Sequence, residues 1–581
     1  MKRHHTLSSF VAVFAYSLSA YATDFHVDPA KGSASGDGSS AKPWKTLEAV
    51  ISANLVATQN WDSLPYTSSK KLKPRNAGAP IKAGDRIVLY NGYHGNVSII
   101  GHYNSANITV AAASGHKPGL SKLLVRSSSN WVFQGLSVNR ELAPSYDNSP
   151  LVSVESHGHN GPVSDITLSG FSVRSVSDTS KWTAGDWDGK AANGIVLGGK
   201  NITISGNVVE DVNFGIVSSA ANSLIEKNTV NRFSGDGLRG LGNYTTFQYN
   251  LVKNCYAVNG NHDDGFQSWS VGGDGKVGTG EVVGGVLRGN MIVNYENENQ
   301  PMRCTLQGIG MFDGMFRDWV IENNVIIIDH WHGITLSGAI NALVVNNTVL
   351  DLNAVKPGPP WIMVGNHKNG TPSSGLVRNN LTTALNNGSG VTEDANMLIN
   401  TASKFFVAPP YDVHLLATSP AIDKGASAKA PSTDIEGIPR PQGKAHDVGA
   451  YEWHDGSVVP PVDGGAGTGG GGPGAGGSPG AGGSPGAGGG SAGSGGGAGG
   501  GSAGEPGVGG GSPGVGGGSA DSGAGAGGSG ATAGSAGSPG SGGAGDDGSC
   551  AFRSSGRTGS TPWWLAASAL ALIAARRRRR S

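Results

Sequence analysis

Three titratable residues occupy the same place in a repeated pattern, directly before a glycine and an apolar residue. They are Asp236 in Asp-Gly-Leu, Asp264 in Asp-Gly-Phe and His332 in His-Gly-Ile. If these segments are successive coils of one solenoid, their side chains form a column on one surface. Packing offers little reason to gather acids and an imidazole there, so the column predicts a catalytic groove.

The two aspartates of this column are expected to be close neighbours. Successive coils of a β-solenoid lie about 4.8 Å apart, and two carboxylates at that distance repel each other. Either one of them holds a proton, or both share a cation or Arg239. Arg239 and Gln267 each lie two residues past their glycine, so we expect them on the same side as the aspartates.

The candidate site residues form three sets. The residues expected to be catalytic are Asp236, Arg239, His262, Asp263, Asp264 and His332. The residues expected to contact substrate are Gln267, Trp269, Arg303, Asp313, His330, Trp182 and Trp187. The residues that could hold a Ca²⁺ cofactor are Asp236, Asp263 and Asp264, because calcium prefers oxygen ligands. A plainer interpretation stays open, in which these aspartates bind Ca²⁺ structurally or fix turns.

The elements that must position these residues are short strands. A glycine followed by an apolar residue recurs at Gly194, Gly215, Gly237, Gly265, Gly308 and Gly333. A second strand of each repeat ends at an asparagine, at Asn207, Asn228, Asn250, Asn290, Asn324, Asn347 and Asn380. No helical period recurs, and apolar residues alternate or form β-branched runs. The pattern predicts a parallel β-solenoid whose asparagines occupy left-handed turns and bond to one another, which is architecture rather than chemistry.

Four segments interrupt the repeat; the first leads into the first coil of the stack, and the other three flank the acidic coils. They are residues 175–192, 255–261, 271–282 and 294–305. Long loops on a rigid scaffold commonly build a binding cleft. The tryptophans of the first segment suit stacking against sugar faces, although burying the loop is an equally good use of them.

Both ends of the repeat resemble secreted right-handed parallel β-helix proteins of the pectate-lyase-like superfamily. The segments that carry the resemblance are 25–29, 35–39, 44–47, 83–89, 419–425 and 447–452. The resemblance implies an all-β, right-handed parallel β-helix with an N-terminal capping helix within residues 43–57. It leaves the activity open, because this superfamily holds lyases, hydrolases, epimerases and adhesins.

Composition divides the chain into four parts. Residues 1–22 have the layout of a secretory signal peptide, and residues 23–455 form the expected β-helix domain. Residues 456–549, rich in Gly, Ser, Ala and Pro, are expected to be a disordered linker. Residues 550–581 combine a cysteine, a short apolar run and five arginines, and resemble the myxobacterial C-terminal sorting tag. This resemblance implies a secreted protein retained at the cell surface, with envelope sorting or anchoring machinery as its partner.

The charge balance excludes one class of partner. Nine of the 42 basic residues lie in the signal peptide and the last 32 residues, where no acidic residue lies, so the rest carries 33 basic against 42 acidic residues. An acidic mature protein is a poor candidate for binding nucleic acid. We expect a monomer acting on a polysaccharide. Export permits a disulfide between Cys255 and Cys304, but the sequence does not show their separation.

Three activities fit the predicted groove. A polysaccharide lyase would neutralise a uronate carboxylate with Ca²⁺ or Arg239 and remove the C5 proton with His262 or His332. A uronate C5-epimerase would begin with the same abstraction, and His262-Asp263 followed later by His332 loosely resembles the mannuronan epimerases, although the full Asp-Pro-His-Asp motif is absent. A glycoside hydrolase would use the two aspartates as its pair of acids. The lyase is favoured narrowly, and a non-catalytic glycan-binding adhesin is the alternative from another class.

Overall fold

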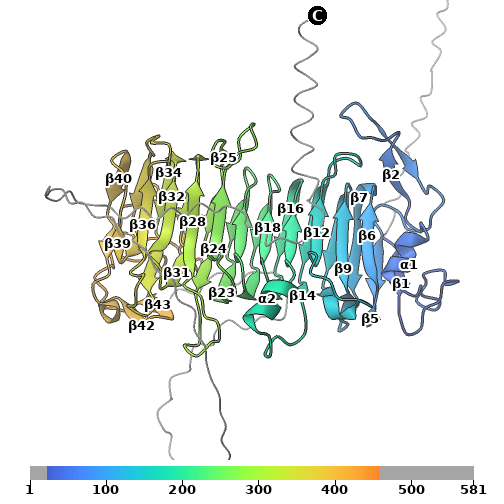
Figure 1. The fold of residues 1–581 in the computed structure, drawn as a ribbon, viewed down its shortest axis with the longest axis horizontal. Coiled ribbons are helices and arrows are strands. Elements are labelled where there is room, and N and C mark those ends of the chain that lie inside the picture. Colours follow the sequence, from blue (N-terminus) through green and yellow to red (C-terminus); the bar gives the residue numbers. More distant parts are fainter. Residues whose placement is uncertain (1–21, 457–581) are drawn as a thin grey trace, which may run out of the picture. The chain divides into compact units, whose positions relative to one another are not determined.

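The described part of the chain coils into a stack of short strands along one axis, and forms a right-handed parallel β-helix (Figure 1). This computed structural model describes residues 22–456. A 15-stranded sheet begins with β1 (Asp24–Val27) and ends with β40 (Val391–Asp394), and a 12-stranded sheet extends from β5 (Gly92–Tyr93) to β41 (Met397–Leu398). The expected all-β class and β-helix are confirmed, whereas the predicted linker and anchor lie outside the described residues.

An 11-stranded parallel sheet carries the predicted column. Its strands are, in stacking order, β6 (Asn96–Ile100), β9 (Lys122–Arg126), β12 (Val152–Glu155), β15 (Ile195–Leu197), β18 (Ile216–Ser218), β21 (Leu238–Gly240), β24 (Asp264–Trp269), β28 (Gln307–Asp313), β32 (His332–Ser337), β36 (Trp361–Gly365) and β39 (Ala384–Leu385). The register aligns Arg239 with Gln267, Gln267 with Gly310, and Gly310 with Thr335. Asp264 and His332 are therefore two coils apart, as predicted.

The asparagine ladder is present and buried. The amide Nδ2 of each ladder residue donates to the Oδ1 of the next, over distances of 2.8–3.0 Å from Asn207 through Asn380, and the ladder continues to Asn396. The predicted backbone conformation is wrong by one position. The left-handed residue precedes each ladder asparagine, as at Lys227 (φ 54°) and Tyr249 (φ 54°). The asparagine itself turns inward, where its amide replaces the backbone partners lost at the corner.

The glycine stack has a steric cause. A Cβ atom placed on Gly308 would lie 2.3 Å from the carbonyl oxygen of Gly333, and one on Gly215 would lie 2.3 Å from that of Gly237. Successive coils thus approach too closely at this corner for any side chain. Each glycine lies within one residue of the start of a strand, so the residue before it lies at the edge of the 11-stranded sheet.

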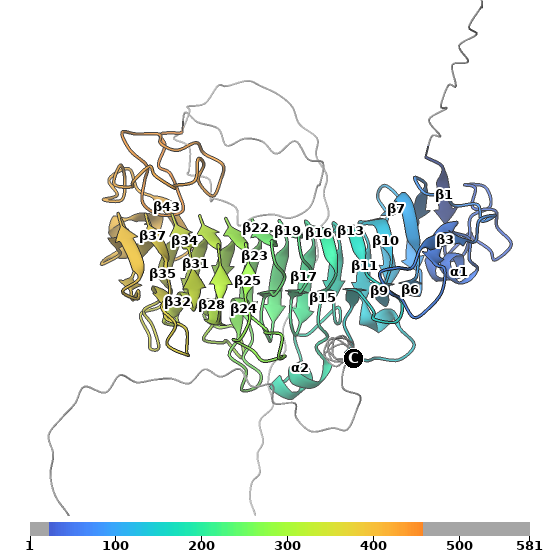
Figure 2. The same cartoon turned by 90° about the horizontal axis from the view of Figure 1, so that it is seen from above.

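A helix covers the N-terminal end of the coil, and the C-terminal segment packs along its side. Helix α1 (Leu47–Ser52), capped by Thr46, buries Leu47, Val50 and Ile51 over the N-terminal end, so the predicted capping helix is present but shorter than residues 43–57. The antiparallel strands β42 (Phe406–Ala408) and β43 (Asp412–Leu415) and the segment up to Tyr451 lie along one side of the last coils (Figure 2). They share an apolar cluster with residues of several coils, among them Val325, Ile327 and Leu350. Within residues 22–456, no helix has the length and apolar character needed to cross a membrane.

The excursion at residues 175–192 contains a helix that the strand pattern did not predict. Helix α2 (Ala184–Lys190) starts with a capping box, in which Thr183 and Asp186 satisfy each other's backbone amides. Its Trp187 is 1% exposed, because the indole packs back onto the β-helix. The capping box and the buried Trp187 therefore hold this helix in one position against the β-helix.

Candidate functional site

The side chains of the column pair with the residue three positions along the same strand. Arg239 donates to Asp236, Gln267 Nε2 donates to Asp264 Oδ2 at 2.9 Å, and Thr335 Oγ1 lies 3.0 Å from His332 Nδ1. In each pair, the residue before the glycine contacts the residue two positions after it. The prediction that Arg239 and Gln267 lie on the side of the aspartates is confirmed.

Asp236 has a resident cationic partner. Its Oδ2 accepts the Arg239 Nε–H at 2.9 Å, and its Oδ1 accepts the backbone N–H of Asp264 at 3.1 Å. The guanidinium carbon of Arg239 lies 4.3 Å from the centre of the Phe214 ring and 4.7 Å from that of Trp269. Only 12% of the Arg239 side chain and 1% of the Asp236 side chain are exposed, so this ion pair is nearly closed to solvent.

Asp264 lies deeper still. It is completely buried, and its Oδ1 accepts no hydrogen bond. A Cβ on Gly310 of the next coil would lie 2.0 Å from that oxygen, so the absence of a side chain at Gly310 gives the carboxyl its space. Burial, and then the charge of Asp236, raise the pKa of Asp264 well above its usual range. Because Arg239 favours the charged form of Asp236, Asp264 is the member of the pair that keeps a proton.

This raised pKa predicts how stability depends on pH. The folded state favours protonated Asp264. The contribution of this residue to the free energy of unfolding is therefore complete below the pKa of about 3.9 that Asp264 has in the unfolded chain, and it is lost as pH rises through the higher pKa that Asp264 has in the folded protein. We expect Asp264→Asn to gain stability relative to the wild type as pH rises from about 4 to 8. Urea unfolding across that range measures it, with exposed Asp62→Asn as the control. Parallel pH profiles for wild type and Asp264→Asn would refute the assignment of the proton.

His332 is the titratable member of the column that reaches the surface. It is partly exposed, and its Nδ1 is engaged with Thr335 Oγ1, which also accepts from Trp361 Nε1 at 3.1 Å. Nε2 is therefore the ring nitrogen left for a ligand. Burial, and then the neighbouring His330 and His262, lower the pKa of His332 to about 3, so the imidazole is neutral at physiological pH.

Predicted His330 and three aromatic residues that the sequence analysis missed, Phe312, Trp331 and Trp361, surround this imidazole. Phe312 and Trp361 lie with ring centres 4.8 and 5.3 Å from that of His332, while Trp331 stacks on Trp361 at 6.1 Å and 14°. His330 stacks on His332 at 5.1 Å. We call these five partly exposed residues the aromatic cluster. Trp361 escaped notice because its coil begins with prolines and has no glycine before the strand, although the register aligns it with His332.

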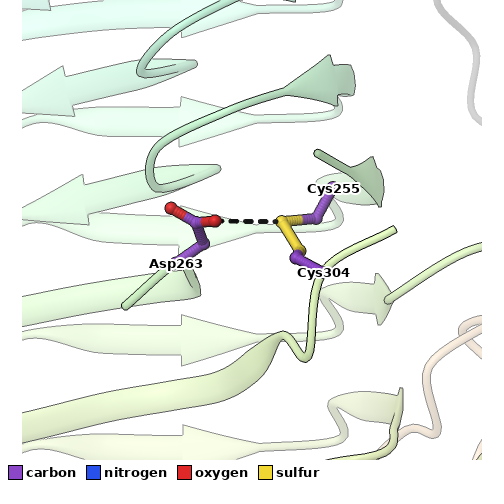
Figure 3. Close-up of side chains that lie close together, drawn as sticks. All are labelled: Cys255, Asp263 and Cys304. Carbon is purple, nitrogen blue, oxygen red and sulfur yellow. Dashed lines mark hydrogen bonds between the residues drawn. A yellow bond between two sulfur atoms is a disulfide. The ribbon is translucent and has the colours of Figure 1, made fainter. Parts of the chain in front are cut away.

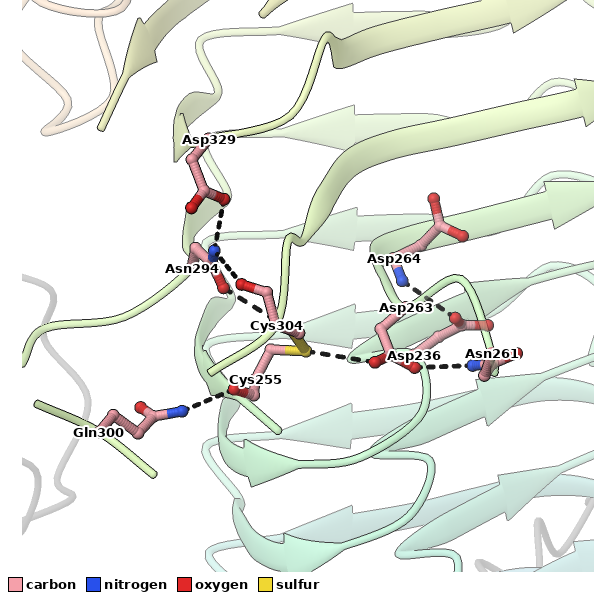
Figure 4. Close-up of a disulfide and its surroundings, with 9 residues drawn as sticks. All are labelled: Asp236, Cys255, Asn261, Asp263, Asp264, Asn294, Gln300, Cys304 and Asp329. Atoms are coloured by element: carbon pink, nitrogen blue, oxygen red, sulfur yellow. Dashed lines mark hydrogen bonds between the residues drawn. A yellow bond between two sulfur atoms is a disulfide. The ribbon is translucent and has the colours of Figure 1, made fainter. Parts of the chain in front are cut away.

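Asp263 faces away from the column toward a disulfide. Its Oδ1 accepts from Asn261 Nδ2 at 2.7 Å, and its Oδ2 lies 3.6 Å from Cys255 Sγ (Figure 3). Cys255 is bonded to Cys304, which answers the question that the sequence left open. Figure 4 shows Asn294 bridging the Cys304 carbonyl and Asp329, with both contacts at 2.7 Å. Burial raises the pKa of Asp263 well above its usual range.

The three aspartates do not fit the predicted calcium site. Ligand atoms of one Ca²⁺ lie within about 4.8 Å of one another, twice the usual Ca–O distance. Among residues 22–456, the grouping of His, Cys, Asp and Glu that meets this limit is Cys255, Asp263 and Cys304. Its two sulfurs are already bonded to each other, and Asp236 already pairs with Arg239. No chemical step is therefore assigned to a metal here.

The disulfide predicts a measurable loss on reduction. It closes a loop over a sequence separation of 49 residues, for which the chain-entropy estimate is about 4 kcal/mol of stability. We expect a reductant to lower the melting temperature of the full chain and to loosen the segments around Asp263. A Cys255→Ala/Cys304→Ala double variant should have the lower melting temperature, and reductant should not change it. Equal melting of wild type with and without reductant contradicts the prediction.

Several predicted residues lie elsewhere. Arg303 stacks on Tyr295 and donates to the Glu298 carbonyl, and Asp313, at the far end of its strand, pairs with Lys368 at 3.0 Å, so neither joins the aspartates. The sequence shows how far each residue lies along its loop or strand, but not where its side chain points in space. His262 is exposed near His332. Trp269 covers Arg239 and lines a cavity of about 290 Å³.

Comparison with known proteins gives fold-level likenesses only. No protein-family model matches the chain, and no curated protein matches its sequence. Among solved structures it is similar to pectate lyase Pel9A, at 16% identity and a TM-score of 0.37, over 75% of this chain and 98% of the other.

Two further structures show a similar degree of likeness. The A-module of the Azotobacter vinelandii mannuronan C-5 epimerase AlgE6 has 12% identity and a TM-score of 0.37, over 54% of this chain and 84% of the module. The GH136 lacto-N-biosidase from Eubacterium ramulus has 13% identity and a TM-score of 0.36, over 65% of this chain and 68% of the other. At these values the likeness does not assign an activity to this chain.

Proposed function

We propose that the outer face of the 11-stranded sheet binds an acidic polysaccharide and that His332 removes the C5 proton of a uronate residue, which makes the protein a polysaccharide lyase. One observation carries this proposal. His332 is a neutral, partly exposed imidazole with a fixed Nδ1 contact and an aromatic surface on either side. Aromatic faces are suited to the apolar faces of sugar rings, so a sugar resting on them presents its ring hydrogens to Nε2.

The substrate supplies part of the base strength. An imidazole with a pKa of about 3 is a weak base in the empty groove. A uronate carboxylate placed beside it adds a negative charge, which raises that pKa. Exposed His262, close enough for its charge to affect His332, is the side chain placed to hydrogen-bond the carboxylate.

The elimination then balances as follows. Nε2 of His332 takes the C5 proton, and the electrons of the C5–H bond form a double bond between C4 and C5. The bond from C4 to the glycosidic oxygen breaks with its electrons on oxygen. That oxygen takes a proton from the His332 imidazolium, which regenerates the neutral base. The products are one chain with an unsaturated uronate at its new non-reducing end and one chain with a new reducing end.

The buried acids argue against a glycoside hydrolase. The two carboxyl groups of a hydrolase must flank the scissile bond, yet Asp236 is 1% exposed and Asp264 is 0% exposed. Phe214, Arg239 and Trp269 cover the first of them. A C5-epimerase shares the proton abstraction and differs only in returning the proton to the opposite face of C5. A glycan-binding adhesin needs the aromatic cluster but no neutral base.

The test is absorbance at 235 nm while the full chain is incubated with alginate, polygalacturonate and other uronate-containing polysaccharides, with Ca²⁺ and with chelator. A rise reports the unsaturated product and supports the lyase. New reducing ends without a rise indicate a hydrolase, and a change in uronate composition without cleavage indicates an epimerase. Binding without any product would leave the adhesin. The chelator arm tests calcium dependence directly.

The location of the protein is part of the proposal. The sequence features of residues 1–22 and 550–581 support export and retention at the outer envelope, with the sorting machinery as partner. Both segments lie outside the described residues except for residue 22. An enzyme held there by a long linker would act on polysaccharide outside the cell. Surface protease treatment of intact cells, followed by the 235 nm assay, tests this placement.

A further inference from the structure

A second cavity lies away from the column, where the chain turns the corner ahead of the 11-stranded sheet. It has a volume of about 290 Å³. It is lined by Ser177, Asp178, Thr179, Ser180, Trp182, Trp187, Asp211, Arg232, Tyr256, Pro301 and Met302. The tryptophans that the sequence offered as groove residues therefore line this cavity and not the column. Its volume suits a ligand of monosaccharide size, at the lower end of small-molecule sites.

The walls of the cavity are fixed by independent contacts. The ring of Trp187 stacks on that of Tyr256 with centres 4.8 Å apart, and the backbone N–H of Ala257 donates to the Met302 carbonyl at 2.7 Å. The disulfide between Cys255 and Cys304 joins the two segments that carry Tyr256 and Met302. The cavity is thus built before any ligand arrives, which lowers the ordering cost of binding.

Its polar groups are arranged for hydroxyl recognition. Arg232 Nε and Nη2 donate to the two oxygens of Asp211 at 2.7 and 2.9 Å, and Thr179 Oγ1 donates to the same carboxylate at 2.8 Å. A paired guanidinium and carboxylate offer donors and acceptors side by side, as vicinal hydroxyls require. The partly exposed Trp182, edge-on to Trp187 at 5.3 Å, adds an aromatic surface.

The charge of the cavity selects against uronates. Asp178 and Asp211 carry negative charge against the single positive charge of Arg232, and an anionic sugar would be repelled. We propose that this cavity binds one uncharged hexosyl residue, at a carbohydrate site separate from the proposed uronate groove. The site would let the protein hold a polysaccharide that contains neutral sugars, whatever reaction the groove performs.

Saturation-transfer NMR on the full chain tests the inference, with methyl glucoside, methyl galactoside, methyl mannoside and glucuronate as separate probes. We expect transfer to at least one neutral glycoside, and less to glucuronate. The signal should vanish in Trp182→Ala and in Ser180→Phe, which fills the cavity from its exposed rim. It should persist in Trp61→Ala, which removes a partly exposed tryptophan of β2 (Thr58–Trp61) near the N-terminal end, away from both proposed sites. Unchanged melting temperatures would show that the variants fold.

Three results would overturn the inference: no transfer to any neutral glycoside, transfer that survives both cavity variants, or stronger transfer to glucuronate than to the neutral probes. None of them touches the elimination proposal, because absorbance at 235 nm reports the groove. Conversely, if the protein shows the expected NMR pattern but no rise at 235 nm, the neutral-sugar site is supported and the lyase proposal is refuted.

Discussion

Replacing His332 by glutamine is expected to lower the rate of elimination by about 10²- to 10⁴-fold, the usual contribution of a positioned general base. Glutamine keeps a polar side chain next to Thr335 but has no nitrogen that accepts a proton near neutral pH. Since the imidazole is partly exposed, the variant should fold normally. The measurement is kcat/KM from absorbance at 235 nm on the polysaccharide that the wild type cleaves.

A matched histidine separates chemistry from general damage. His116 is also partly exposed, and its ring packs edge-on against Tyr90 at 4.9 Å near the N-terminal end. His116→Gln should leave kcat/KM within the error of the wild type. If His332→Gln were as active as His116→Gln, His332 would not be the base, and the aromatic cluster would be a binding surface only.

The pH profile gives a second reading of the same residue. In wild type, the titration of His332 that limits kcat/KM should fall near pH 3, because burial and its histidine neighbours lower its pKa.

Thr335→Val removes the oxygen that contacts Nδ1 of His332. We expect this variant to bind polysaccharide but to react more slowly, as a positioning residue would.

Replacing Glu452 by glutamine is expected to destabilise the protein by about 3–5 kcal/mol, the cost of leaving a buried charge without its partner. Glu452 Oε2 lies 2.7 Å from Arg440 Nη1, and both side chains are 0% exposed. The same carboxylate accepts the backbone N–H groups of Gln442 and Asp447 at 2.9 and 3.0 Å. The neutral amide cannot balance the guanidinium, so the closing segment, residues 406–453, should unfold first.

An exposed pair of the same type provides the control. Arg317 and Glu281 are joined by two hydrogen bonds of 2.8 and 2.6 Å, but their side chains are 38% and 40% exposed. Water screens that pair, so Glu281→Gln should cost less than about 1 kcal/mol. Urea unfolding of both variants gives the comparison. Similar small losses in the two would mean that the closing segment contributes little to the stability of the β-helix.

The sequence was sufficient for those features that depend on a repeat. A period of 21 or 22 residues, a glycine at one corner and an asparagine at another predict a solenoid. The ladder and the two-coil separation of Asp264 from His332 follow from that period, because stacked coils put equivalent positions in line. Arg239 and Gln267 could be placed on the side of the aspartates for the same reason.

Tertiary structure alone decided which members of the column are accessible. Asp236 and Asp264 have the same sequence context as His332, yet Phe214, Arg239 and Trp269 cover Asp236, and Asp264 is completely buried. The imidazole of His332 reaches the surface. Burial depends on side chains from other coils and loops, and the repeat does not encode their directions. Our proposal therefore takes the exposed imidazole, and neither carboxylate, as the base.

The loops show the same division. The sequence located the interruptions but not the positions of their side chains. Arg303 stacks on a tyrosine, Asp313 pairs with a lysine, and Trp187 lines the second cavity. Irregular segments lack a period, so their path is fixed by contacts such as the disulfide at Cys255 and the capping box of α2. What recurs along the chain could be predicted from it, and what depends on a contact between non-repeating segments had to be seen in the fold.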